Sequence, residues 1–199
     1  KAGHAATQHV LLGLFPAPVA DSTFLTKVTA QINDEAISEQ VRRVRRTGRV
    51  AEMEGAALAE GFQAPIGIGH TRWATHGRPS EVNAHPHAAG SVAVVHNGII
   101  ENHVELRKEL QGRGVVFASD TDTEIVAHLV DEKLRNGAKS LEEAVRQSLT
   151  HLRGAFAIAV VWKDAPDEIV VAKQDSPLVV GIGDGETFAA SDIPALLAH

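Results

Sequence analysis

The middle of the chain contains two apolar runs of strand length. Residues 91–96, Ser-Val-Ala-Val-Val-His, are apolar on both alternating faces, which a strand tolerates only when something covers both sides of its sheet. Residues 66–69, Ile-Gly-Ile-Gly, form a shorter run that we expect to be a buried strand ending at a polar loop. Both runs predict strands inside the fold, and the first should be central.

Four segments place apolar residues at helical spacing. Residues 49–61 gather four apolar side chains on one side and end at Gly61, which predicts a helix. Three later segments begin with a polar residue followed three positions on by Glu, the pattern of a helix capping box. These pairs, with the helices that they predict, are Asn102 and Glu105 for residues 102–112, Thr121 and Glu124 for residues 121–137, and Ser140 and Glu143 for a helix that includes Leu152.

The two ends of the chain are patterned differently. At the start, residues 10–14 suit an early helix stopped by the prolines of residues 15–18, and periodicity is weak up to Gln40. After Gly154, short β-rich runs alternate with turn residues, so neighbouring strands should pair antiparallel. The runs are residues 157–162, 169–172 and 178–182, and a short helix capped by Ser191-Asp192 should follow over residues 193–197.

The combination of strands buried on both faces with amphipathic helices predicts an α+β fold, in which two sheets pack together with helices outside. Periodicity alone specifies only a mixture of α and β. A chain of 199 residues with 44% hydrophobic residues is long enough for one substantial core. We therefore expect a single domain over residues 1–199.

Composition excludes several classes of protein. The chain has no cysteine, so it has neither a disulfide framework nor a thiolate metal site. Nothing resembles a secretion signal or a membrane span, and we expect a cytoplasmic protein without a membrane partner. The net charge of -6 opposes nucleic-acid binding, and the basic run 42–49 lacks interleaved aromatic residues, so we interpret it as a solvated strand or turn.

Eleven histidines raise the question of a metal site. The candidate ligands are His70, His76, His85, His87 and His96. No His-Glu-x-x-His helix or similar ligand spacing is present, so we expect neither a metal ion nor another cofactor.

Polar residues concentrate in residues 70–83, directly after the shorter apolar run. Arg72 can grip a carboxylate with two parallel hydrogen bonds, and Thr75 and His76 lie on the same loop. Binding groups commonly occupy loops that a rigid strand supports. The alternative is a plain surface loop with a stacked Trp73 and a helix-starting serine.

Four stretches of the chain occur in a distinctive order. They are Thr71-Arg72-Trp73-Ala74-Thr75-His76-Gly77, Asn83-Ala84-His85-Pro86-His87, Val95-His96-Asn97-Gly98-Ile99-Ile100-Glu101-Asn102 and Ser119-Asp120-Thr121-Asp122-Thr123-Glu124. In this order they resemble the glutaminase domain of the glucosamine-6-phosphate synthases, the glutamine:fructose-6-phosphate amidotransferases. The resemblance runs from residue 41 to residue 199. It implies the four-layer α/β/β/α fold of the amidohydrolases that use an N-terminal nucleophile.

The resemblance also implies a binding site for L-glutamine. It assigns Arg72 to the α-carboxylate of glutamine and Asp122 to its ammonium group. Thr75 and His76 would orient the amino-acid end of the substrate, and Trp73 would be a mobile or supporting part of the pocket. Taken alone, Asp122 would equally suit the N-terminus of a helix, since a carboxylate complements the helix dipole there.

The pair Asn97-Gly98 has two interpretations. It is the strongest two-residue turn signal in the sequence, and alone it predicts an ordinary hairpin tip. The resemblance instead implies an oxyanion hole. Attack on an amide carbonyl creates an oxyanion that needs preorganised donors, and a side-chain amide beside a glycine N–H is a suitable pair.

The resemblance fails over residues 1–40. The family attacks glutamine with an N-terminal cysteine whose own α-amine acts as the base. That cysteine opens a Cys-Gly-Ile-Val-Gly strand in the family, and this strand is missing here. This chain begins with residues 1–4, Lys-Ala-Gly-His, and contains neither cysteine nor tyrosine. Three explanations stay open: an N-terminus that was removed or wrongly assigned, a pseudo-glutaminase, and a divergent enzyme with another nucleophile.

Two classes of function follow from the resemblance. The first is the glutamine-hydrolysing domain of an amidotransferase that makes glucosamine 6-phosphate, inactive as written because it lacks the cysteine. Its partner would be the C-terminal sugar-phosphate isomerase region of a homo-oligomeric parent, and that region is absent from these 199 residues. The second is a catalytically silent glutamine-binding or interaction module with the same pocket.

Overall fold

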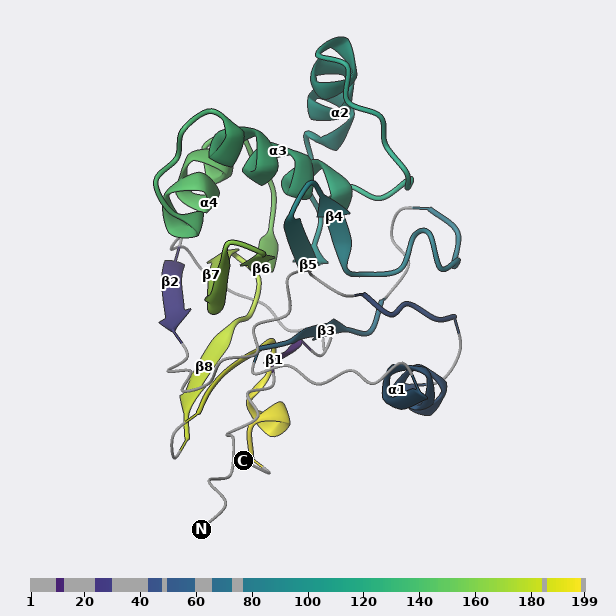
Figure 1. Ribbon diagram of the computed structural model, residues 1–199, viewed down its shortest axis with the longest axis vertical. Helices are drawn as coiled ribbons and strands as arrows, with labels where there is room; N and C mark the ends of the chain where they lie inside the picture. The colour runs from purple at the N-terminus through teal and green to yellow at the C-terminus, as the bar shows by residue number, and fades with distance from the viewer. Residues whose placement is uncertain are drawn as a thin grey trace.

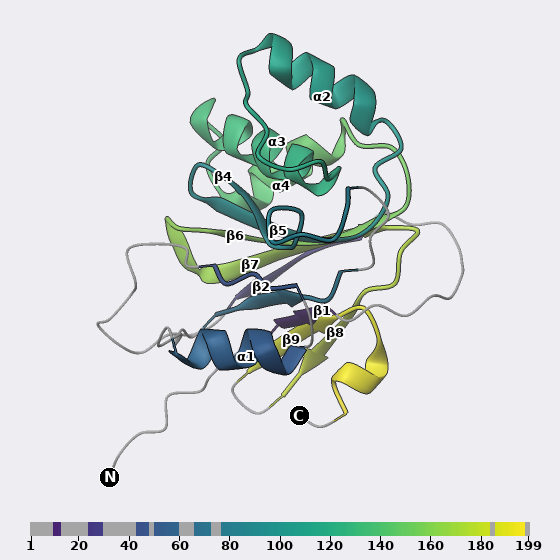
Figure 2. The ribbon, with the colours of Figure 1, turned by 90° about the vertical axis from the view of Figure 1, so that its right-hand side faces the viewer.

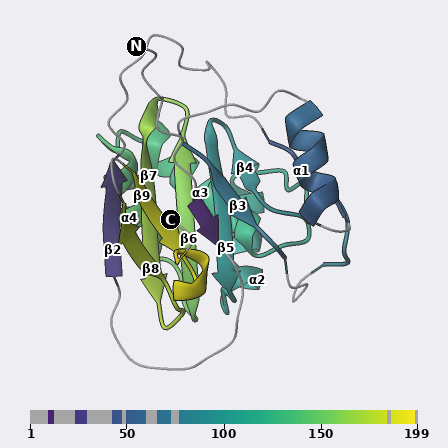
Figure 3. The same ribbon diagram turned by 90° about the horizontal axis from the view of Figure 1, so that it is seen from below.

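The computed structural model arranges the chain in layers (Figure 1). Helices cover one face of a five-stranded sheet, and shorter strands pack against the other face (Figure 2). Helix α1 (Val50–Ala59) lies to one side of those shorter strands (Figure 3). Helices together with two packed layers of strands confirm the expected α+β fold. The structure describes residues 10–12, 24–29, 43–47, 50–59, 66–72, 77–183 and 186–197.

The five-stranded sheet is antiparallel throughout, in the order β2-β7-β6-β5-β4. Strand β5 lies inside the sheet between β6 and β4, and its residues 92–97 are all buried, as a strand covered on both faces should be. The prediction of an internal strand buried on both faces is therefore confirmed, although β6 holds the middle position. The members of the sheet are β2 (Phe24–Thr29), β4 (His87–Ala89), β5 (Val92–Gly98), β6 (Phe156–Trp162) and β7 (Ala165–Gln174).

Shorter strands form the second layer, which Figure 3 shows from below. β1 (Val10–Leu12) pairs in parallel with β3 (Ile68–His70), and β8 (Val179–Ile182) pairs antiparallel with β9 (Thr187–Ala190). β1 also contacts β9, so the two pairs lie next to each other. The apolar core between this layer and the large sheet includes Val95, Ala159, Ile169, Val171 and Ala189.

The larger apolar core lies between the sheet and the helical layer of α2 (His103–Gly112), α3 (Thr123–Arg135) and α4 (Leu141–Leu149). α3 packs on β4 and β5, and α4 packs on β6 and β7. Ile125 and Leu129 are examples of fully buried side chains on α3. Burial of each such side chain stabilises the fold by roughly 1.5–3 kcal/mol. This packing fixes α3 against the end of β5, where the candidate site lies.

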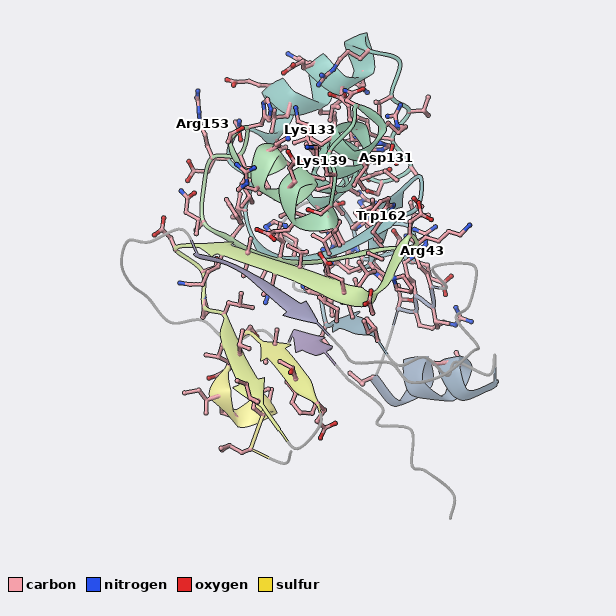
Figure 4. The ribbon with its side chains drawn as sticks, turned by 60° about the vertical axis from the view of Figure 1, so that its left-hand side comes forward. Arg43, Asp131, Lys133, Lys139, Arg153 and Trp162 are labelled. Atoms are coloured by element: carbon pink, nitrogen blue, oxygen red, sulfur yellow. The ribbon has the colours of Figure 1, made fainter. Side chains whose placement is uncertain are left out.

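Charged side chains occupy the helical layer as well (Figure 4). Asp131 accepts a 2.8 Å hydrogen bond from Arg135, one turn later on α3, and Lys139 after that helix is exposed. No helix in the described ranges is both long and apolar enough to cross a membrane.

The predicted start of α2 is right, but the predicted cap is wrong. The Asn102 side chain makes no capping bond. Its amide donates to the carbonyl of His151 at 2.8 Å, and its oxygen accepts from the backbone N–H of Arg153 at 3.0 Å. The Asn102 side chain therefore bonds the distant backbone of residues 151–153 instead of capping its own helix.

The capping prediction is also wrong at α3 and right at α4. α3 begins two residues later than the pattern indicated, and Thr121 instead contacts His87, with 3.1 Å between Oγ1 and Nε2. At α4, Ser140 caps as predicted, since its hydroxyl accepts from the backbone N–H of Glu143 at 3.1 Å. Ser140 is extended and has no competing partner among the described contacts, so the local pattern decides the outcome there.

Several other predictions need correction. The early helix over residues 10–14 is wrong, because residues 10–12 form the strand β1. The run 66–69 yields a strand that begins at Ile68 and is half-buried. The antiparallel pairing holds for β6 with β7, but β8 pairs with β9 instead of β7. The last helix is only a 3-10 turn, Ile193–Ala195, and its cap is Asp192.

Candidate functional site

Asn97 and Gly98 are the last two residues of β5. They pair with Ala157 and Phe156 of β6, and the helices α2 to α4 intervene between the two strands. The hairpin-tip interpretation is therefore wrong. Gly98 has φ of 115°, and a Cβ there would run into the carbonyl of Ala155. Only glycine suits this position, because no L side chain tolerates both the dihedral and the close backbone.

The chain after Gly98 is held against the start of β6 by backbone bonds. Ile99 N donates to Ala155 O at 2.8 Å, and Glu101 N donates to Arg153 O at 2.9 Å. Gly154 lies on the other side of this crossing, and a Cβ on it would meet the carbonyl of Ile99. The end of β5 is therefore fixed by main-chain contacts.

The side-chain amide of Asn97 is buried, with 5% of the residue exposed. Its Oδ1 lies 2.8 Å from Nε2 of His70, the last residue of β3. Its Nδ2 makes no hydrogen bond to the protein, a statement that covers only the described part of the chain. A buried donor without a partner costs roughly 1–3 kcal/mol, and such atoms call for an explanation that often lies in function.

Asp122 is buried next to this strand end, although it lies far away in the sequence. Its Oδ2 accepts a 2.9 Å hydrogen bond from the backbone N–H of Ile100, two residues after Gly98. Its Oδ1 lies 4.0 Å from Nδ1 of His96. Asp122 occupies the N-cap position of α3 but makes no capping bond. Asp122 therefore lies at the start of the helix, as that interpretation expects, but its carboxylate bonds the backbone of Ile100 and does not cap the helix.

Arg72 follows β3 and reaches toward the loop that starts at Gly77. Its Nη2 donates to the carbonyl of Gly77 at 3.1 Å, and the side chain is half-buried. Burial lowers the pKa of Arg72, while the charge of Asp122 raises it. The two groups therefore interact electrostatically. The structure brings Arg72 and Asp122, the two predicted charge-binding residues, to the same region as Asn97 and Gly98.

The loops that carry Arg72 and Asp122 are tied together by Asn83. Its Oδ1 accepts from the backbone N–H of Asp120 at 3.0 Å, and its Nδ2 donates to the Asp120 carboxylate at 3.3 Å. The same Nδ2 also donates to the carbonyl of Arg78 at 3.0 Å. Asn83 thereby links the loop after β3 to the loop before α3.

Glu124 holds the loop before α3 from the helix side. Its carboxylate accepts from the backbone N–H groups of Ala118 and Ser119, at 2.8 and 2.7 Å, and from the Ser119 hydroxyl at 2.5 Å. Hydrogen bonds from His128, Ser119 and the loop backbone lower the pKa of Glu124 to about 2, although burial opposes them. Sequence analysis assigned Glu124 to a capping box and missed this contact, which no local spacing signals.

Four buried or half-buried histidines surround the end of β5. Thr123 Oγ1 lies 3.0 Å from His85 Nε2 and 2.9 Å from His96 Nδ1. The ring centroids of His70 and His85 lie 3.9 Å apart. The histidines were candidate metal ligands by residue type, whereas no pattern in the sequence indicated the contacts of Thr123. Among the residues that the structure describes, no group of three or more His, Cys, Asp or Glu side chains could hold a metal ion.

Burial lowers the pKa of three of these histidines. Burial lowers the pKa of His70 to about 4, while the hydrogen bond with Asn97 and the nearby His96 backbone act against burial. The pKa falls to about 4 for His87 and well below the ordinary value for His85, and burial is again the main cause. At neutral pH these imidazoles are uncharged, so they act as hydrogen-bonding groups and not as cations.

This cluster predicts that the protein loses stability in mild acid. A histidine in the unfolded chain has a pKa near 6.5, whereas burial lowers the pKa of His70 and His87 in the folded protein to about 4. The unfolded chain therefore takes up protons first, and the free energy of unfolding should fall as pH drops from 6.5 to 4, by about 3 kcal/mol for each of the two histidines. Urea unfolding at pH 7, 5.5 and 4.5 measures this loss.

A matched variant separates the cluster from the rest of the protein. His87→Gln removes one of the titrating groups, so its stability should fall less steeply over the same interval, while His151→Gln at an exposed position should follow the parent. A parent protein equally stable at pH 7 and pH 4.5 would contradict the burial of neutral histidines.

The remaining predicted site residues, Trp73, Thr75 and His76, lie outside the described residues. Arg72, Asn97, Gly98 and Asp122 are described and lie together, although they come from three different elements. Their binding and catalytic roles stay predictions at this point.

Comparison with known proteins gives the family. Residues 70–198 match the glutamine amidotransferase domain family. Three curated relatives carry the name glutamine–fructose-6-phosphate aminotransferase [isomerizing]. That of Thermococcus kodakarensis is 53% identical over 77% of this chain and 25% of its own length. The relative from Neisseria meningitidis serogroup A is 52% identical over 80% of this chain and 26% of its own length. The relative from Vibrio vulnificus is 50% identical over 89% of this chain and 28% of its own length.

Similarity to solved structures is weaker than similarity to these curated relatives. The glutamine phosphoribosylpyrophosphate amidotransferase from B. subtilis aligns over 60% of this chain and 33% of its own, with 23% identity and a TM-score of 0.42. A similarity at that level carries no argument. The chain spans about a quarter of the length of the curated relatives. Because the family match over residues 70–198 spans more than half of the sequence, the chain belongs to the glutamine amidotransferase domain family.

Proposed function

We propose that this chain is the glutamine-hydrolysing part of an amidotransferase that makes glucosamine 6-phosphate from fructose 6-phosphate and L-glutamine. The names of the relatives support the reaction. The observation that carries the proposal is Asn97 Nδ2, a buried donor without a protein partner among the described residues, next to a glycine that no other residue can replace. An oxyanion formed during amide hydrolysis is a suitable partner for it.

The proposed substrate contacts follow from charge. Free glutamine carries an α-carboxylate and an α-ammonium group. Arg72 is proposed to bind the first through its guanidinium, and Asp122 the second through its carboxylate. Trp73, Thr75 and His76 are proposed to complete the pocket. No metal ion or other cofactor is part of the proposal, since acyl transfer to a thiol and then to water needs none.

The nucleophile is the one group that the 199 residues do not contain, because they include no cysteine. We propose that the parent protein supplies a terminal thiol, which attacks the amide carbon, while Asn97 Nδ2 and Gly98 N–H stabilise the oxyanion. The rest of the parent is proposed to be the sugar-phosphate isomerase region of a cytoplasmic homo-oligomer. The alternative is a silent glutamine-binding or interaction module with the same pocket.

Binding of the free amino acid tests the two charged contacts. Arg72→Ala should abolish detectable binding of L-glutamine, because the substrate carboxylate would then lie unpaired in a partly closed pocket, a loss of about 100-fold or more. Asp122→Ala should weaken binding in the same way through the ammonium group. Calorimetry of the unaltered chain and both variants measures the effect.

Two comparisons make this test specific. Glutamine within a peptide lacks both charges and should bind weakly to the unaltered chain. Lys139→Ala removes an exposed cation from the helical layer and should bind glutamine like the parent. An Arg72→Ala affinity within a factor of two of the parent would show that the carboxylate contact is wrongly assigned.

A further inference from the structure

The amide of Asn97 has two possible orientations in its pocket. The oxygen and nitrogen ends of a side-chain amide have nearly the same size, so packing alone does not distinguish them. Only one orientation turns Nδ2 toward an oxyanion. The other turns Oδ1 toward it, and two negative oxygen atoms would then repel each other. An oxyanion hole built on Asn97 therefore needs a neighbour that selects the orientation.

His70 is the neighbour in position to do so. Its Nε2 lies 2.8 Å from Asn97 Oδ1. The ring sits at the end of β3, and pairing between β1 and β3 fixes the backbone there, with His70 opposite Leu12. The ring of His85 packs against it at 3.9 Å, so the imidazole is held on a second side as well.

We propose that His70 is a positioning residue, which keeps its proton on Nε2 and thereby holds the Asn97 amide with Nδ2 directed at the oxyanion. The inference rests on the proposed function, because the oxyanion belongs to glutamine hydrolysis. His70 touches neither substrate nor nucleophile in this arrangement. It acts only through Asn97.

Charge and tautomer support the assignment. Burial lowers the pKa of His70 to about 4, so the ring is neutral at pH 7 and carries a single N–H. If that N–H is on Nε2, it donates to Asn97 Oδ1, and Nδ2 stays available. If it is on Nδ1 and directed at the His96 backbone, the Nε2 lone pair faces Asn97 and demands the opposite amide orientation.

The geometry favours the first arrangement. Nδ1 of His70 is buried and has no partner at hydrogen-bonding geometry in the described part of the chain. A proton on Nδ1 would therefore be an unsatisfied donor, whereas a proton on Nε2 has an acceptor at 2.8 Å. One hydrogen bond thus determines both the tautomer of His70 and the orientation of Asn97.

Nitrogen NMR of the 199-residue chain, labelled with 15N in histidine and asparagine, tests the tautomer without any enzyme assay. At pH 7 the His70 signals should be those of a neutral ring protonated on Nε2, with a bond to the Asn97 side chain. A ring protonated on Nδ1 would overturn the inference, even if the protein hydrolyses glutamine.

Two substitutions test the consequence for catalysis. The side-chain nitrogen of His70→Gln can occupy the place of Nε2, whereas that of His70→Asn reaches only the place of Nδ1. In the chain preceded by the family's opening Cys-Gly-Ile-Val-Gly strand, the Gln variant should keep kcat within about threefold of the parent. The Asn variant should lose about 30-fold or more in kcat at nearly unchanged KM. His151→Gln is the surface control.

The outcomes separate the inference from the proposed function. Equal kcat in the Gln and Asn variants, with both folded by circular dichroism, would refute the positioning role. If no form carrying the cysteine hydrolyses glutamine, the proposed function fails, and the NMR result still decides the inference. The Asn97 side-chain signals should then shift in His70→Asn and stay in place in His70→Gln, and equal shifts in both variants would overturn it.

Discussion

The 199-residue polypeptide is expected to release no measurable ammonia from L-glutamine, and the same chain preceded by the Cys-Gly-Ile-Val-Gly strand is expected to release it at an enzyme's rate. Under the proposed function the groups near Asn97 position glutamine and stabilise an oxyanion, but water attacks an amide poorly. Catalysis that survives loss of a nucleophile is typically about 10³–10⁴ over water, far below a working enzyme.

The assay is production of glutamate and ammonia, after the mass of each chain has been confirmed. The matched control carries serine in place of the added cysteine and should stay inactive, because a thiolate is far more nucleophilic than a hydroxyl at neutral pH. Robust turnover by the unaltered chain would refute the need for a thiol and direct the search for a nucleophile to residues 1–40.

The second large effect is expected at Asn97. In the cysteine-carrying chain, Asn97→Ala should lower kcat by about 10²–10³ and leave KM nearly unchanged, because an oxyanion donor acts in the transition state and not on the bound substrate. Steady-state kinetics over a range of glutamine concentrations gives both constants.

Loss of the Asn97 amide also removes the 2.8 Å hydrogen bond between Asn97 Oδ1 and His70 Nε2, so a moderate decrease in stability should accompany the kinetic effect. Thermal unfolding measures that decrease separately. Asn136→Ala, at the exposed end of α3, is the matched control and should change neither constant. A defect in Asn97→Ala confined to KM would mean that Asn97 binds the substrate and does not stabilise the oxyanion.

Periodicity predicted the elements whose burial repeats along the sequence. The strand at residues 91–96 and the helices α2 to α4 were foreseen, because their apolar residues face a core at the period of the element. Helix α1 was foreseen as well, although its first apolar residue, Val50, is exposed. Predictions failed where a distant partner decides the local outcome. Asn102 and Thr121 carry capping patterns, but each side chain bonds residues that lie far along the chain.

The candidate site shows the same division. Motifs singled out Arg72, Asn97, Gly98 and Asp122 from their residue types and their resemblance to a family. Their convergence depends on contacts such as that of Asp122 with Ile100, which no spacing rule supplies. The tie between His70 and Asn97 was missed for the same reason, and the only signal for it was that His70 directly precedes the first motif.

The crossing of Gly98 and Gly154 restricts how this domain can evolve. Each glycine faces a backbone carbonyl on the opposite segment, Ala155 for Gly98 and Ile99 for Gly154. A side chain gained on one segment cannot be accommodated by a smaller side chain on the other, because the obstacle is main chain. A second substitution therefore cannot compensate for loss of either glycine. A one-residue insertion in either segment would shift its carbonyl groups out of register with the N–H groups that they accept from. Changes to the neighbouring site therefore have to come from the surrounding loops, while these two positions stay glycine.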